Sequence, residues 1–152
     1  MPTIIAIVIA VIAVAVAIGA WFRPTPKPEA PAAKTYSDQE VADAKKAVCD
    51  AFDLVHEAVR INTGRDGGAD PAATLAVAAN ARLSLYGGAG YLIDTLQKNP
   101  ATPEELSGSV QKLADTFRYL TIQFMINKQN SDLDEPLRDA DSATASIQSI
   151  CK

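Results

Sequence analysis

TPEELSGSVQKLADTFRYLTIQF, residues 102–124, repeats its large apolar side chains at alternating steps of four and three. That spacing places them along one stripe of an α-helix, as in helices that pack lengthwise against other helices. Thr102, Pro103 and Glu105 precede the stripe and predict a capping box with Thr102 as N-cap. The segment therefore predicts a long amphipathic helix. Its expected core positions are Leu106, Val110, Leu113, Phe117, Leu120 and Phe124.

Two earlier segments have the same periodicity. The first starts at Ser37, where Ser37 and Glu40 predict a capping box, and ends at Gly64. The second has Asp70 as N-cap and Pro71 at its first helical position. The expected core positions are Val41, Ala44, Val48, Phe52, Val55 and Val59 in the first, and Leu75, Ala78, Leu85, Ala89, Leu92 and Leu96 in the second.

A fourth apolar segment starts near Ser131 and carries Leu133, Leu137, Ala140, Thr144 and Ile147. Connections of about eight, four and two residues between the four segments make each helix run antiparallel to its predecessor. The sequence therefore predicts an all-α fold, with an up-down-up-down four-helix bundle at residues 36–152.

An uninterrupted apolar run, residues 4–22, precedes this domain and is followed by Arg23. Its 19 residues would span about 28 Å as a helix, close to the hydrocarbon thickness of a bilayer. A cleavable signal peptide is the alternative, but such peptides have a basic leading segment and a shorter apolar core. We therefore interpret residues 1–22 as a single-pass transmembrane anchor in the cell membrane.

One face of this anchor is made of alanines. Small residues let membrane helices approach closely, so the face predicts contact with another membrane helix, either in a second copy or in another envelope protein. An alanine-rich composition is the alternative, because Ala15 lies off the face. The alanines of the predicted interface are Ala6, Ala10, Ala13, Ala17 and Ala20.

Residues 23–35 contain four prolines and have a net charge of +2, a composition typical of an extended polyproline stalk. Residues 36–152 have 11 basic and 17 acidic side chains, a net charge of −6. A negatively charged domain argues against nucleic acid as a partner.

The two cysteines, Cys49 and Cys151, lie near opposite ends of the domain sequence. In an up-down-up-down bundle the last helix returns along the first, so a disulfide would close a loop of about 100 residues and contribute up to about 4–5 kcal/mol. Two free thiols are the alternative. A disulfide suits an oxidising compartment and favours an extracytoplasmic domain, whereas the basic residues that follow the anchor favour the opposite orientation. We favour the extracytoplasmic side because of the cysteines.

Arg82 falls in the core series of its helix, where a buried arginine needs a partner. Asp141 and His56 are the nearest polar candidates at the same level of the bundle, and Tyr86 lies one turn away. These four residues form a candidate pocket for a small ligand; a side chain that reaches solvent at the bundle edge is the alternative. His56 is the only histidine, so we expect no metal site.

Gly87, Gly88 and Gly90 lack the spacing and the preceding strand of a phosphate-binding loop. Each glycine costs up to about 1 kcal/mol in a helix, so the group predicts close packing against a neighbouring helix or a local kink. We favour close packing.

The helix at 102–124 has a second apolar face opposite its core stripe, formed by Tyr119, Ile122 and Ile126. This face predicts a partner surface; the alternative is that this half of the helix is unusually central or that the bundle is irregular.

Four short stretches, WFRP at 21–24, VCDAF at 48–52, AANAR at 78–82 and the terminal CK at 151–152, resemble small alanine-rich, single-pass membrane-anchored proteins of mycobacteria and related actinobacteria. The resemblance covers most of the chain and implies a cell-envelope setting with an extracytoplasmic domain. It carries no activity over to particular residues. Such proteins have a basic or proline-rich cytoplasmic lead that this chain lacks, which leaves the orientation open.

Together these features predict a non-enzymatic accessory protein without cofactors that docks onto envelope proteins through its membrane helix and its bundle. A module that binds a small ligand or lipid in the bundle core near Arg82 is the alternative. An enzyme is the third possibility, and no nucleophile–base pair, metal cluster or carboxylate dyad supports it.

Overall fold

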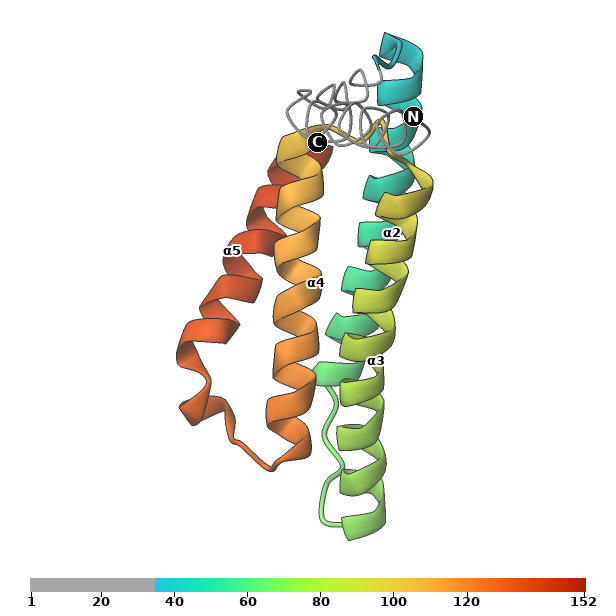
Figure 1. The fold of residues 1–152 in the computed structure, drawn as a ribbon. Coiled ribbons are helices and arrows are strands. Elements are labelled where there is room, and N and C mark those ends of the chain that lie inside the picture. The colour runs from blue at the N-terminus through green and yellow to red at the C-terminus, as the bar shows by residue number, and fades with distance from the viewer. Residues whose placement is uncertain (1–34) are drawn as a thin grey trace, which may run out of the picture. The chain divides into compact units, whose positions relative to one another are not determined.

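The computed structural model describes residues 35–152, so the predicted anchor with its alanine face, and all but the last residue of the predicted stalk, lie outside the described residues. The compact unit runs from Tyr36 to Lys152. It consists of α2 (Asp38–Thr63), α3 (Pro71–Lys98), α4 (Glu104–Met125), the 3₁₀ helix η1 (Asn130–Asp132) and α5 (Asp134–Cys151), as Figure 1 shows. The predicted all-helical four-helix bundle is confirmed for this part of the chain. None of these helices is both long and apolar enough to cross a membrane.

The ends of α2 and the start of α3 agree with the sequence-based prediction. The Ser37 side chain accepts a hydrogen bond from the backbone N–H of Glu40, and the Ser37 N–H donates to the Glu40 carboxylate at 2.8 Å. Hydrogen bonds from the backbone and side chain of Ser37 hold the pKa of Glu40 below its usual value. Gly64 ends α2, and Asp70 accepts a hydrogen bond from the backbone N–H of Ala72 at 2.9 Å. These local signals need no tertiary contacts to act.

Two predicted helix starts are wrong. Thr102 does not cap α4, because its hydroxyl donates to the carbonyl oxygen of Asn99 at 2.6 Å and is used in the turn that follows α3. Pro103 is the N-cap residue of α4, and its side chain makes no capping hydrogen bond. The last helix begins at Asp134 instead of Ser131, because residues 130–132 form η1 with its own cap interactions. The α4–α5 connection is therefore longer than expected.

The core follows the predicted apolar stripes of the four helices. Leu92 and Ile147 are 0 % exposed, and the α4 stripe is buried except for Phe124, which is partly buried. Burial of each such side chain stabilises the fold by about 1.5–3 kcal/mol. Leu75, predicted to lie in the core, is instead 67 % exposed. The first turns of α3 extend beyond the ends of α4 and α5, so no neighbouring helix covers this residue (Figure 1).

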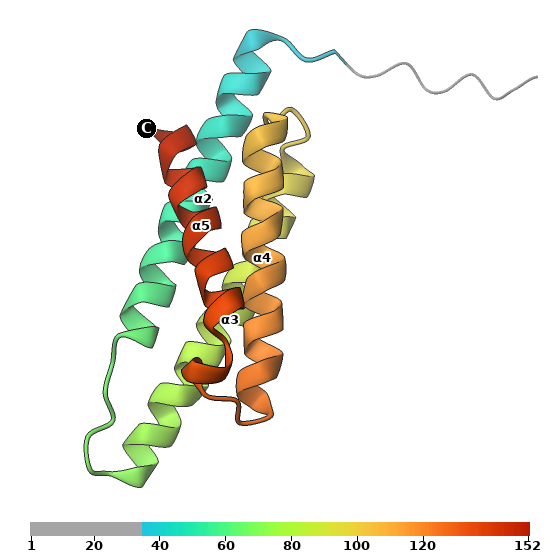
Figure 2. The ribbon, with the colours of Figure 1, turned by 90° about the vertical axis from the view of Figure 1, so that its left-hand side faces the viewer.

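The four helices do not pack equally closely on all sides. Contacts are dense between α2 and α3, between α3 and α4, and between α4 and α5, but sparse between α2 and α5. Both ribbon views show α2 and α5 nearer to each other at the C-terminal end of α5 and farther apart at its N-terminal end (Figures 1 and 2). The bundle is therefore less closed on this side than on the others.

Candidate functional site

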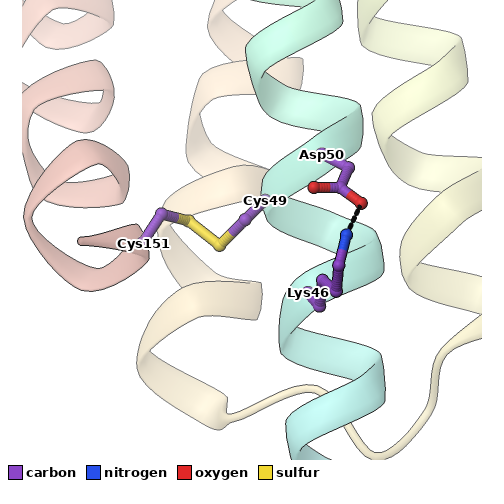
Figure 3. Close-up of a disulfide and its surroundings, with 4 residues drawn as sticks. All are labelled: Lys46, Cys49, Asp50 and Cys151. Atoms are coloured by element: carbon purple, nitrogen blue, oxygen red, sulfur yellow. Dashed lines mark hydrogen bonds and ion pairs between the residues drawn. A yellow bond between two sulfur atoms is a disulfide. The ribbon is translucent and has the colours of Figure 1, made fainter.

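The closed end of the α2–α5 side contains the disulfide. Cys49 of α2 and Cys151 at the end of α5 are bonded, with their Cα atoms 5.7 Å apart, so the predicted pairing is confirmed (Figure 3). Both residues are partly buried against the core. Lys46 and Asp50 form an exposed ion pair beside Cys49 on α2, and this pair contributes little to stability because water screens it. The disulfide is therefore the strong link between α2 and α5.

The open end of the same side contains a cleft of about 610 Å³ between the four helices. Arg82 of α3 and Asp141 of α5 both line it, as the sequence predicted for two of the four pocket residues. The rest of its wall is mostly apolar and includes Val59, Leu85, Phe117, Leu120, Phe124 and Leu137. This volume lies within the range of ligand pockets, about 300–1,000 Å³.

The other two predicted pocket residues lie outside the cleft. His56 stacks its ring on Phe52 of the same helix, with the ring centroids 5.5 Å apart. Tyr86 is 61 % exposed on the outer side of α3. Tyr86 is rotated by about 100° from Leu85, which lines the cleft, whereas His56 lies about one turn from Val59 in the direction of the disulfide. Within residues 35–152, no group of three His, Cys, Asp or Glu side chains could hold a metal ion.

Arg82 has no ion-pair or hydrogen-bond partner among the described residues, although Asp141 lines the same cleft. Its side chain is partly exposed and also borders a second hollow, of about 460 Å³, formed with Lys128 and the polar residues that follow α4. Phe124 and Asn130 border both spaces. The apolar cleft thus continues into a polar region that contains two cationic side chains.

The three glycines of α3 have different surroundings. A Cβ atom on Gly88 would lie 2.6 Å from Cγ1 of Val55, so Gly88 permits the close contact with α2 that we expected. Apart from the adjoining backbone of α3 itself, a Cβ atom added to Gly87 or to Gly90 would meet no atom of residues 35–152 within 4 Å, so these two glycines face open space there. Close packing within the described residues therefore explains only one of the three.

The outer side of α3 is an apolar surface that the sequence-based search for sites missed. Its exposed large side chains are Leu75, Leu83, Tyr86 and Tyr91, with Leu83 67 % exposed. We call these four residues, together with Gly87 and Gly90, the α3 outer face. The 28 residues of α3 include only three charged side chains, Arg82, Asp94 and Lys98. So few charges are unusual for a helix with one side exposed, and they are the sequence signal of this surface.

The predicted partner patch on α4 lies at the surface. Tyr119, Ile122 and Ile126 are all exposed, and so is Met125 between them in sequence. A central position of this half of α4 in the bundle is therefore wrong, whereas the exposure does not decide between a partner surface and an irregular bundle. α3 and α4 pack side by side, so the α3 outer face and the α4 patch are on neighbouring helices.

Comparison of the chain with profiles of known protein families, with curated protein sequences and with solved structures finds no match.

Proposed function

We propose that this chain is a membrane-anchored, non-enzymatic accessory protein of the cell envelope that docks onto another envelope protein. The observation that carries the proposal is that α3 has few charged residues and exposes four large apolar side chains on the side that the described bundle leaves uncovered. Helices of that composition are normally buried all round, and contiguous exposed apolar surface marks sites of association. The α3 outer face and the α4 patch are the proposed docking surfaces.

The glycines support a helical partner. Gly87 and Gly90 each cost α3 up to about 1 kcal/mol relative to alanine, and nothing within the described chain makes use of the space they leave. A partner helix could use that space, because helices with small residues at their contact approach each other closely. The exposed side chains around the glycines, Leu83 and Tyr86 among them, would then supply the buried apolar area.

The predicted anchor and stalk give this module its setting. A stalk at 23–35 in the polyproline conformation reaches about 40 Å, enough to hold the domain clear of lipid head groups. The disulfide favours the extracytoplasmic side, where such bonds persist. The alanine face of the anchor would add a second contact with the same partner inside the bilayer.

Replacing Gly87 and Gly90 together by alanine is expected to raise the stability of the domain and to weaken its docking. The domain should become more stable by about 0.5–1 kcal/mol per site, because alanine restricts the unfolded chain more than glycine. Docking should weaken, because the two methyl groups block close approach. Gly108→Ala is the matched control: it too has open space around it, lies in α4, and should stabilise without weakening docking.

Gly88→Ala should destabilise the domain, whereas the substitutions at Gly87 and Gly90 should stabilise it. Its Cβ would press on the stiff, β-branched Val55 at 2.6 Å, and such overpacking costs about 1–3 kcal/mol. Urea unfolding of the full-length chain in lipid vesicles, followed by circular dichroism, measures all these variants. Equal stabilisation by all three α3 substitutions would show that Gly88 is not packed as described.

Crosslinking in native membranes measures docking directly. A photoreactive residue in place of Leu83 should form a discrete crosslinked product with a second protein, and the Gly87→Ala, Gly90→Ala double variant should lose most of it. The same photoreactive residue in place of Asp53, which is exposed on α2, is the control and should give no such product. Similar products from both positions, or none from position 83, would contradict the proposal.

Ile122→Asp tests the α4 patch. Because Ile122 is 54 % exposed, we expect the free energy of unfolding to change by no more than about 0.5 kcal/mol. The yield of the crosslink from position 83 should fall, since a charge in an apolar contact is costly to desolvate. Gln111→Asp, at an exposed position of the same helix, should leave both unchanged. Unfolding by Ile122→Asp would place this residue in the core instead.

A further inference from the structure

The cleft at the open end of the bundle has the two parts that an amphiphile requires. Its wall is mostly apolar, with side chains from all four helices, among them Val59, Leu85, Phe117 and Leu137. Its continuation past Phe124 is polar. A hydrocarbon chain in the first part would cover apolar surface that the sparse α2–α5 contact leaves accessible.

The charges at this site favour a head group with one negative charge. Arg82 borders both the apolar cleft and the polar hollow and has no ion-pair partner within residues 35–152, and Lys128 lies in the same hollow. A guanidinium binds carboxylate or phosphate oxygens in a two-point geometry. Asp141 on the opposite wall of the cleft repels anions, which disfavours head groups of higher charge.

We infer that this cleft binds a single-chain amphiphile with an anionic head group, its hydrocarbon chain between the helices and its head group at Arg82 and Lys128. A long-chain fatty acid is the simplest member of this class, and a lysophospholipid with one negative charge is the other. The side-chain amide of Asn130, which also lines the cleft, can donate hydrogen bonds to head-group oxygens. This ligand site is separate from the docking surfaces on the outer sides of α3 and α4.

Photolabelling tests the inference on the full-length chain in lipid vesicles. The probe is a palmitate analogue with a diazirine on its chain, and the labelled peptides are identified by mass spectrometry. Label should appear in the peptides that line the cleft, those containing Leu120 and Leu137 for example, in addition to residues 4–22, which serve as the reference for probe that has simply partitioned into the bilayer. Label confined to residues 4–22 would overturn the inference.

Two matched pairs of variants test where the hydrocarbon chain and the head group of the probe bind. Ala78 lines the cleft and Ala79 does not, so Ala78→Phe should abolish cleft labelling while Ala79→Phe should retain it. Arg82→Gln should raise the probe concentration required for half-maximal labelling about tenfold, since one charge-assisted hydrogen bond is lost. Arg118→Gln, which removes an arginine already paired with Asp115 at 3.6 Å, should leave it unchanged.

Competition distinguishes the sources of the ligand. Unlabelled palmitate or lysophosphatidylglycerol should reduce cleft labelling, and the stronger competitor identifies the source as free fatty acid or membrane lipid. Hexadecanol has the same chain without the charge and should compete at least tenfold less well. If hexadecanol competes as well as palmitate, or if the wild type and Arg82→Gln are labelled equally, the inference that the site recognises an anionic head group is overturned. Circular dichroism and an intact disulfide confirm folding of each variant, and crosslinking from position 83 reports docking independently.

Discussion

Replacement of Cys49 and Cys151 together by serine is expected to lower the free energy of unfolding of the domain by about 4 kcal/mol. The two residues are 102 positions apart in sequence, so their bond removes much of the conformational entropy of the unfolded chain. We also expect the bond to hold α2 and α5 together in the native state, because these helices share few other contacts. Without it, α5 is held mainly by α4, through Ile147 in the core and the ion pair of Lys112 with Asp139 at 2.8 Å.

Urea unfolding of the full-length chain in lipid vesicles, with and without a reductant, measures this effect. Each single serine variant should lose as much stability as the double variant, since either one breaks the same bond. The double variant should no longer respond to the reductant, which controls for effects on the rest of the protein. An unchanged unfolding midpoint of the wild type after verified reduction would show that the disulfide does not hold the bundle closed.

Leu92→Ala is expected to have the second large effect, lowering the free energy of unfolding by about 3 kcal/mol. Leu92 is 0 % exposed at the centre of the bundle, and truncation of a buried leucine typically costs 2–5 kcal/mol, through lost transfer energy and the cavity that remains. Leu83→Ala removes the same atoms from the same helix, but Leu83 is 67 % exposed. That variant should change stability by less than about 0.5 kcal/mol.

The pair therefore measures which side of α3 faces the core, in the same unfolding experiment and independently of any partner. A loss at position 83 comparable to that at position 92 would mean that α3 is rotated from the orientation described. A small loss at both positions would mean that α3 is loosely attached to the bundle.

Predictions from local sequence succeeded where the competing interactions are also local. The Ser37–Glu40 capping box formed as expected, since both groups belong to the first turn of α2. The same reasoning failed at Thr102, where the preceding turn offers its hydroxyl a carbonyl oxygen of Asn99. A capping pattern in the sequence does not show whether the Ser or Thr hydroxyl will bond to the helix that follows it or to the turn that precedes it.

The candidate sites were predicted less completely than the helices. Arg82 and Asp141 share a cleft as expected, but His56 and Tyr86 lie outside it. Tyr86 is rotated by about 100° from Leu85 and His56 lies about one turn beyond Val59, so sharing a cavity requires both the rotation and the exact level of each residue, which the periodicity alone does not give. The polar continuation around Lys128 was not foreseen, because it depends on the path of the connection between α4 and α5.

By itself, the sequence determined the number and order of the α-helices in residues 36–152 and the starts of α2 and α3, and it predicted the pairing of Cys49 with Cys151 that the structure shows. Apolar periodicity, caps and short connections specify these features, and each acts within a few residues or through topology alone. Only the tertiary structure decided that Gly88 touches Val55 while Gly87 and Gly90 do not touch another helix of residues 35–152, that one side of α3 is left uncovered by these residues, and that α2 and α5 separate beside Arg82. Those outcomes depend on the rotation and spacing of whole helices, which arise from the packing of all side chains together.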